Sequence, residues 1–572
     1  MSTTLKLPVA LIIIIAVGIA GIGGGYYYGL SVGGAEATKL IETERTQWQS
    51  ELDKKIEEAK TLWVGVTGLG ISLDPAYCWA SDLQQFLLTG VYDTLIRTRG
   101  YDVGTFYPCL AESWEISDDG LSYTFHLYKG VKFASGNEVT ADAVAYTYWR
   151  IMKLNLGPAW LFTQCIDVNN TDSIKVLDRY TVQINLAERF PPFMTILACM
   201  NGGVMDPAEV EKHGGQLSEE SVEYFSEHSA LAGSGPYILD HWTREVEAVL
   251  IRNPNYWGGS DGVVPWFDKI VFQEIKEPAD QKMMLERGDL DIAYGTTPDM
   301  WVEWQQNKKV DLNPLDPARY YYMGMNCKDL DSPFRDLKVR QAVKCAIDRE
   351  VFLELDLGFG HLQGGPVVYG YPGDDPTLLE GPYSSVGNIA KAKQLMSESN
   401  YPNGFKTELL VSEGTIREQM APLVKEQLAQ IGIDVDIRVY ASATALMMFR
   451  RAEYKGLAVF SWGIDYPDPQ NLADIHMTVG GAVNLRVEYT PDIHPSLLET
   501  DELCKQAMET EDPVLRGELY KEAQWIDHEY GPWVYFYGVT YMRPRRHVIH
   551  GGFPMNPLYG WELKEMWKEI EW

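Results

Sequence analysis

Hydrophobic and polar residues alternate in two short segments of the first half of the chain. Residues 121–127 (LSYTFHL) place apolar side chains at every second position, and residues 180–186 (YTVQINL) repeat this pattern. Such alternation is typical of half-buried β-strands. Between these segments Val144, Tyr148 and Met152 recur every four residues, and Thr140 stands at the expected N-cap. The pattern therefore predicts two strands separated by a helix.

The second half combines strand and helix patterns in sequence order. Residues 408–411 and 433–439 predict strands, and residues 416–431 between them predict a helix that Gly432 ends. Because this order needs a crossover, we expect the two strands to be parallel. Apolar residues at four-residue spacing predict a further helix from Pro333 to Val351. Loops are expected at 201–236, 253–266 and 358–388, where Gly and Pro cluster, and the fold class is α/β.

The first sixty residues differ from the rest. Leu7 to Gly25 is an uncharged apolar run long enough to cross a bilayer, so residues 1–34 are expected to form a membrane anchor. Residues 35–60 lack Gly and Pro and predict a solvated helical stalk. Ala35-Glu36-Ala37 resembles a signal-peptidase site, so a cleaved signal peptide is the alternative.

The charge of the protein belongs to the remaining body. The chain has 49 Lys and Arg against 80 Asp and Glu, a net charge of −31, whereas residues 1–60 carry six basic and seven acidic side chains. A body this acidic repels phosphates, and the sequence contains no basic cluster large enough to overcome that field. Nucleic acid is therefore excluded as a partner.

Catalytic and metal-binding signatures are missing from the sequence. It contains no Walker A motif and no H-E-x-x-H motif, and the G-x-S-x-G match at residues 29–33 lies beside the apolar run. We therefore expect no enzyme activity, cofactor or metal. The seven cysteines are dispersed, which leaves room for one to three disulfides and at least one free thiol. Cys345 is expected to be a buried free thiol.

Six segments, in order, resemble one family: the extracytoplasmic solute-binding proteins of ABC importers, family 5, of the peptide and nickel type. The most specific is Tyr107–Arg150, in which Cys109 replaces the usual small residue. The other five are Gly233–Pro236, Arg252–Gly258, Met284–Ile292, Arg335–Glu350 and Trp462–Pro469.

This resemblance implies a two-lobe, periplasmic-binding-protein-like fold (type II, cluster C) with an inserted third domain. In this chain the fold would be preceded by the N-terminal transmembrane helix expected from the apolar run. Lobe I would comprise residues 61–75, 206–317 and 531–572, the inserted domain residues 76–205, and lobe II residues 318–530. Two strands, at 318–326 and 533–541, would cross between the lobes. Ligand would bind between the lobes, which would close on it.

The resemblance also implies a function. The chain would be the binding subunit of an ABC importer, capturing short peptides at the outer face of the membrane and passing them to permease and ATPase subunits. Oligosaccharides, nickel or another solute are alternative ligands within the family. A surface receptor that has no transport role is an alternative from a different functional class.

Family members suggest where a peptide would bind. Asp465 matches the acidic residue that pairs with a peptide's ammonium group, although it could instead cap the turn before Pro467. The backbone of Ser461 to Gly463 would pair with an extended peptide. Trp462 in the same segment is a further candidate. Tyr77, Trp79 and Trp160 are also candidates, with an ordinary packing role as the alternative. No cation for a peptide carboxylate stands out among Arg438, Arg450 and Arg451.

Overall fold

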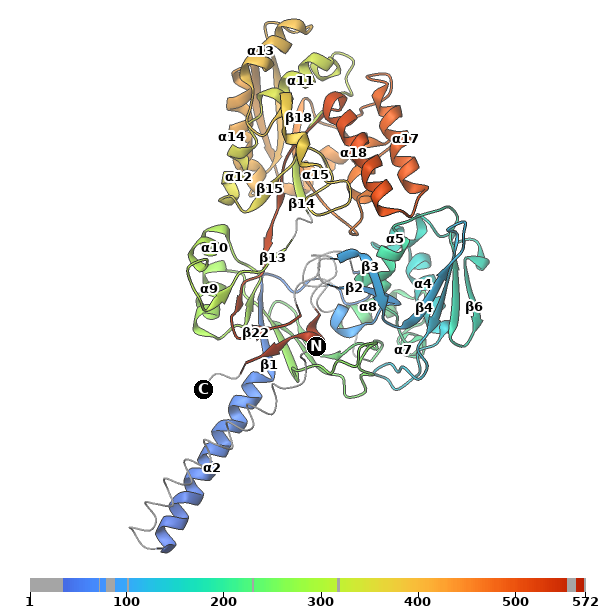
Figure 1. The fold of residues 1–572 in the computed structure, drawn as a ribbon, viewed down its shortest axis with the longest axis vertical. Coiled ribbons are helices and arrows are strands. Elements are labelled where there is room, and N and C mark those ends of the chain that lie inside the picture. Colours follow the sequence, from blue (N-terminus) through green and yellow to red (C-terminus); the bar gives the residue numbers. More distant parts are fainter. Residues whose placement is uncertain are drawn as a thin grey trace. The chain divides into compact units, whose positions relative to one another are not determined.

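The computed structural model describes residues 34–70, 72–78, 88–99, 102–228, 231–315, 319–552 and 562–569. The chain divides into two compact units, residues 1–61 with 568–572 and residues 62–567. In the first unit, helix α2 (Gly34–Ala59) covers the segment predicted as a helical stalk (Figure 1). The apolar run from Leu7 to Gly25 lies outside the described residues. Among the helices that are described, none is long and apolar enough to span a membrane.

A seven-stranded sheet organises one part of the second unit. Its order is β12-β21-β11-β1-β10-β9-β8, and β1 and β11 pair in parallel. The strands are β1 (Thr61–Val66), β8 (Tyr237–Thr243), β9 (Glu247–Arg252), β10 (Lys269–Glu274), β11 (Ile292–Ala293), β12 (Val310–Asp311) and β21 (Arg545–Arg546). Helices from this part of the chain are α7 (Pro207–Lys212), α8 (Glu219–Glu227), α9 (Pro278–Arg287) and α10 (Pro298–Trp304).

A four-stranded antiparallel sheet, ordered β4-β5-β7-β6, lies within the predicted inserted domain. Its strands are β4 (Ala111–Ile116), β5 (Ser122–Leu127), β6 (Ile174–Asp178) and β7 (Thr181–Asn185). On β5, Tyr123, Phe125 and Leu127 are buried as the alternation predicts. Helices α4 (Ala141–Leu154), α5 (Ala159–Thr163) and α6 (Phe193–Ala198) share its hydrophobic core, and β2 (Ile96–Arg99) pairs with β3 (Asp102–Pro108).

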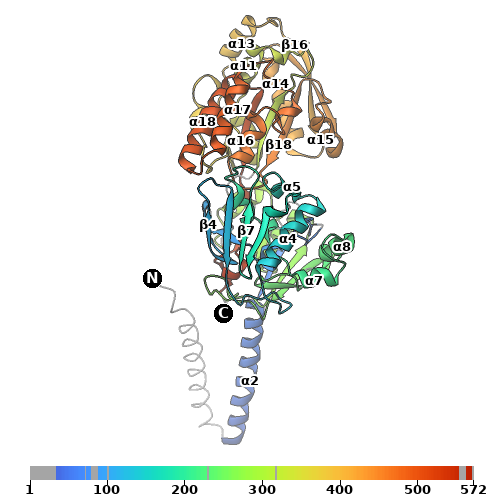
Figure 2. The ribbon, with the colours of Figure 1, turned by 90° about the vertical axis from the view of Figure 1, so that its right-hand side faces the viewer.

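A six-stranded mixed sheet, ordered β15-β19-β14-β18-β16-β17, carries the largest hydrophobic core. Its strands are β14 (Arg319–Met325), β15 (Gly360–Leu362), β16 (Phe405–Ser412), β17 (Ile433–Tyr440), β18 (Leu457–Gly463) and β19 (Trp533–Val539). Its helices are α11 (Leu337–Ala346), α12 (Glu350–Leu353), α13 (Ile389–Glu398), α14 (Ile416–Ala429), α15 (Ser442–Arg450), α16 (Gln470–Met477), α17 (Ser496–Met508) and α18 (Pro513–Tyr530) (Figures 1 and 2). The predicted parallel pairing of β16 with β17 is confirmed.

Two antiparallel pairs connect the seven-stranded and six-stranded sheets along the chain. Strand β13 (Pro314–Leu315) pairs with β20 (Tyr541–Met542), and the adjacent β14 pairs with β19. Strands β14 and β19 lie in the two segments predicted to cross between lobes. The described residues confirm the mixed α/β class, and the domain boundaries stay predictions. A last pair joins β22 (Ile549–His550) to β23 (Trp567–Lys568).

Several local predictions were wrong. The helix expected from Pro333 to Val351 is broken into a 3₁₀ turn (Pro333–Arg335), α11 and α12. Ile347 adopts an extended conformation and ends α11, and buried Arg349 donates hydrogen bonds to the carbonyls of residues 383, 384 and 535. The loop expected at 201–236 contains α7 and α8, whose N-termini are capped by Asp206 and Ser218.

The bonding state of the cysteines also differs from the one to three disulfides for which the sequence left room. All seven are buried and free in the structure, including Cys345, for which this was predicted. Burial raises the pKa of the Cys345 thiol to about 11. These thiols therefore pack as small apolar side chains.

Candidate functional site

The segment that follows β18 forms the centre of the candidate site. Residues 457–460 of β18 are buried and residues 461–463 are half-buried, so the strand emerges from the core at its carboxyl end. Residues 464–469, here called the Asp465 loop, then lead into α16. Strand β14 pairs with β18 as far as Gly463, whereas β16 pairs with it only at Leu457 and Ala458. Among the described strands, the other edge of Ser461 to Gly463 therefore has no partner.

Asp465 is held at the start of this loop by one side chain. Its backbone N–H donates to Oδ1 of Asn471 at 2.8 Å, and Nδ2 of Asn471 lies 3.4 Å from Oδ2 of Asp465. Burial raises the pKa of the Asp465 carboxyl to about 6, against the opposing effects of Asn471 and Arg486. An incoming cation would compensate this desolvated carboxylate.

Asp468, on the other side of Pro467 from Asp465, caps the start of α16. Oδ1 of Asp468 accepts a hydrogen bond from the backbone N–H of Gln470 at 2.9 Å, at the start of α16. Both oxygens of Asp468 also accept hydrogen bonds from Arg516 of α18, at 2.9 and 2.7 Å. This buried bidentate pair fixes the end of the Asp465 loop.

Aromatic rings and arginines stack beside β18. The rings of Phe460 and Phe449 stack with centroids 3.9 Å apart. Arg417 lies 5.3 Å from the Phe460 ring, and Arg486 lies 5.4 Å from Phe449 and 5.5 Å from Trp462. Within the described residues, no carboxylate lies within ion-pair distance of either arginine, and the buried indole N–H of Trp462 has no acceptor. The site thus combines one carboxylate with two guanidinium groups that lack a paired acid.

Sequence reasoning missed these two arginines and considered surface residues instead. Arg450 and Arg451 are exposed, and Arg438 pairs with Glu408 and Asp436. The missing signal was strand direction. Since β16 and β18 are parallel, their carboxyl ends lie at one edge of the sheet, and Arg417 follows the end of β16 by five residues.

Tyr77 lies in a turn at residues 74–77 that buried side chains hold in place. Asp74 accepts hydrogen bonds from Arg150 at 2.7 and 2.6 Å, and both side chains are fully buried. Asn201 donates to the carbonyls of Pro75 and Cys78, both at 3.0 Å. The Tyr77 side chain remains 38% exposed, so the turn presents it outward. Trp79 lies outside the described residues.

Trp160 lies in α5, on the side of the four-stranded sheet. Its ring centroid is 6.2 Å from that of Tyr466, the residue after Asp465. The structure therefore brings Trp160 next to the Asp465 loop, together with Ser461, Trp462 and Gly463 of β18. No described contact links Tyr77 to this group.

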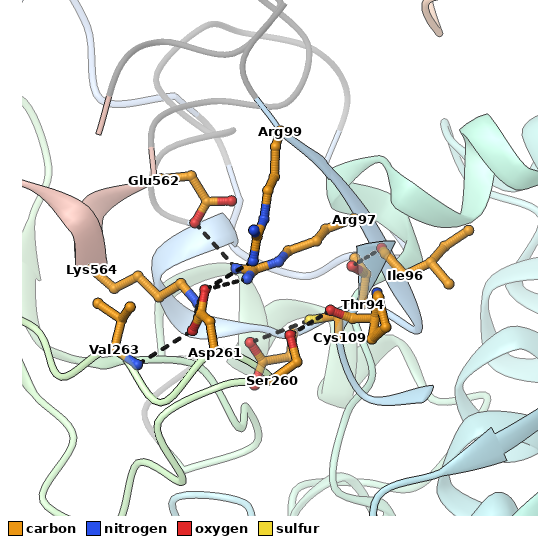
Figure 3. Close-up of polar contacts among 12 residues, drawn as sticks. Thr94, Ile96, Arg97, Arg99, Cys109, Ser260, Asp261, Val263, Glu562 and Lys564 are labelled. Atoms are coloured by element: carbon orange, nitrogen blue, oxygen red, sulfur yellow. Dashed lines mark hydrogen bonds and ion pairs between the residues drawn. The ribbon is translucent and has the colours of Figure 1, made fainter. Parts of the chain in front are cut away.

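A separate polar cluster surrounds Asp261. Figure 3 shows Arg97, Arg99 and Lys564 converging on this carboxylate. Their nearest nitrogens lie 2.5, 3.2 and 2.9 Å from its oxygens. Glu562 lies 3.5 Å from Arg97. These ion pairs hold the pKa of Asp261 well below its usual range, although burial opposes them. The charges of this cluster are paired with one another. We therefore assign it a structural role, in which it holds together β2, residues 258–261 and residues 562–564.

Three comparisons relate the chain to known proteins. Residues 105–483 match the family model described as bacterial extracellular solute-binding proteins, family 5 middle. The chain is 28% identical over 452 residues to the probable D,D-dipeptide-binding periplasmic protein DdpA of Escherichia coli K12, covering 78% of this chain and 82% of DdpA. It is 27% identical over 481 residues to heme-binding protein A of Haemophilus influenzae, covering 79% and 83%.

A solved structure shows the same fold. The periplasmic binding protein DppA of Helicobacter pylori, in complex with the peptide STSA, superimposes with a TM-score of 0.69 at 24% identity. The match covers 90% of this chain and 100% of that one.

Proposed function

Because this chain belongs to family 5 of the bacterial extracellular solute-binding proteins, we propose that it captures short peptides for an ABC importer. The observation that carries this choice of ligand is the desolvated carboxylate of Asp465 beside an unpaired strand edge. DdpA and the DppA structure bear names that record peptide ligands, which supports the same class.

The chemistry of a peptide matches the groups around Asp465. The ligand's ammonium would bind Asp465, and its backbone would pair with the free edge of Ser461 to Gly463. Its carboxylate would bind Arg417, because a half-buried guanidinium without an acid partner favours an anion. Trp462 would donate its indole N–H to a ligand carbonyl. Tyr77, Trp79 and Trp160 would form aromatic walls.

The proposal extends to location and partners. Residues 1–34 would tether the protein to the outer face of the cell membrane, and α2 would hold the binding unit away from it. A permease and an ATPase would receive the ligand. The acidic surface would keep the tethered protein soluble.

Calorimetric titration of the full chain with trialanine and with N-acetyl-trialanine tests the proposal. We expect 1:1 binding of trialanine and at least about tenfold weaker binding of the acetylated peptide, since acetylation removes the ammonium charge. Asp465→Asn should abolish this discrimination. Asp436→Asn, at an exposed position of β17, is the matched control and should keep it.

Equal affinity for both peptides would overturn the role of Asp465. Binding of cello- or manno-oligosaccharides, nickel or heme instead of peptides, detected by a rise in melting temperature, would overturn the ligand class.

A further inference from the structure

We propose that Tyr466 and Arg189 form a latch that holds the Asp465 loop against the domain of the four-stranded sheet and sets how readily the protein closes on its ligand. This inference rests on the proposed function, since it concerns the regulation of the same site. It assigns to the inserted domain an energetic role in ligand capture.

Tyr466 is the first part of the latch. It follows Asp465 directly, yet its ring belongs to the hydrophobic core of the four-stranded sheet and is 1% exposed. Its centroid lies 6.2 Å from Trp160 and 6.5 Å from Phe190, the latter in an edge-to-face arrangement. Such ring pairs add stability beyond the buried area alone. The Asp465 loop is therefore anchored in a core that belongs to a different sheet from β18.

Arg189 is the second part of the latch. It extends from the domain of the four-stranded sheet to the segment between α17 and α18, whereas Tyr466 extends from the Asp465 loop into that domain. Arg189 follows β7, and its Nη1 donates to the backbone carbonyl of Glu509 at 2.6 Å. Its Nε lies 3.9 Å from Oε1 of Glu511. Glu509 and Glu511 lie between α17 and α18, and Met508 packs against the same core as Tyr466. An aromatic contact through Tyr466 and a charged contact through Arg189 thus both join the domain of the four-stranded sheet to the part of the chain that carries the six-stranded sheet.

Gly120 provides the space that Arg189 occupies. A Cβ atom at this position would lie 2.6 Å from Nε of Arg189, and the φ angle of Gly120 is +67°. Glycine therefore suits the backbone conformation, and a larger residue here would require the guanidinium group of Arg189 to shift.

The latch has a physical task in the absence of ligand. The aromatic contact of the latch places Tyr466 in the core of the four-stranded sheet, and the carboxyl group of the preceding Asp465 is buried as well. If closure removes water from that carboxylate, its desolvation opposes closure. The contacts of the latch stabilise the closed form and so offset this desolvation cost. The closed form therefore stays populated to some extent without ligand. A ligand cation then removes the desolvation cost and shifts the population further towards closure.

Small-angle X-ray scattering of the ligand-free full chain tests the latch. Arg189→Ala and Tyr466→Ala should each increase the radius of gyration, because the open form becomes more populated. Arg179→Ala is the matched control, since Arg179 pairs with Glu138 within the inserted domain and is 62% exposed. It should leave the radius unchanged. Melting curves will identify any variant that fails to fold. If Tyr466→Ala does not fold, Arg189→Ala still tests the latch, because it removes only a half-buried side chain.

Titration with trialanine provides the second readout. Arg189→Ala should weaken binding about fivefold to twentyfold, mainly through faster dissociation, because a charge-assisted hydrogen bond of the closed form is lost. Unchanged scattering in a folded Arg189→Ala variant would overturn the latch. A wild-type protein that binds no peptide would refute the proposed function instead, and the ligand-free scattering would still decide the latch.

Discussion

Arg516 of α18 donates two hydrogen bonds to Asp468, and both side chains are more than nine-tenths buried. Burial opposes the charge on Arg516, yet its interaction with Asp468 raises its pKa well above the usual range. This pair joins a helix far along the chain to the segment that carries Asp465. We therefore expect the position of the Asp465 carboxyl group to depend on this buried pair.

Arg516→Met should be strongly destabilising, because it leaves the Asp468 carboxylate buried and unpaired. We expect a loss of about 3–5 kcal/mol in the free energy of unfolding, measured by urea denaturation. Lys521→Ala, which removes an exposed ion pair with Glu518 on the same helix, should change stability by less than about 1 kcal/mol. A loss for Arg516→Met no larger than that of the control would show that the pair does not hold the loop.

Asp465→Asn should stabilise the ligand-free protein above pH 6. The folded-state pKa of Asp465, about 6, lies above the value of about 3.9 for a free aspartate carboxyl group, so its ionised form opposes folding. Stability of the wild type is gained as the pH falls from about 6 towards 4, and the variant lacks this dependence. Melting temperatures measured at pH 5 and pH 8 should therefore differ less for the variant. An Asn variant that melts below the wild type at pH 8 would contradict this expectation.

Peptide affinity should depend on pH through the same carboxyl group. Below pH 6 the protonated Asp465 no longer attracts an ammonium group, so affinity should fall by up to about tenfold per pH unit. Above about pH 8 the amino terminus of the peptide loses its proton, and affinity should fall again. Titrations with trialanine between pH 4.5 and 9.5 measure this profile. A flat profile for trialanine would contradict it.

Arg417→Met should weaken binding only of peptides with a free carboxylate. Trialanine should lose about tenfold or more in affinity, whereas trialanine amide should bind both proteins equally. The long Met side chain retains apolar contact with Phe460, so the comparison isolates the charge. Equal losses of affinity for trialanine and its amide would show that Arg417 does not bind the peptide carboxylate. Arg486 would then be the next residue to test.

Periodic segments were predictable because local physics determines them. The helix expected at 416–431 is α14, which ends at Ala429, and Met420, Val424 and Leu428 form its buried face. Arg417 could not be recognised in the same way, since its role depends on the direction of β16 relative to β18. The break at Ile347 also escaped prediction, because a hydrophobic pattern does not reveal a buried arginine that takes carbonyl partners from distant segments.

The placement of β21 has a consequence for the order of folding. This strand, from residues 545 and 546, lies between β11 and β12 in the seven-stranded sheet that begins with β1 at residue 61. The sheet remains incomplete until almost the whole chain is available, so its early strands must wait for a late partner. A newly made chain would therefore lack a finished first sheet until its last residues have been synthesised.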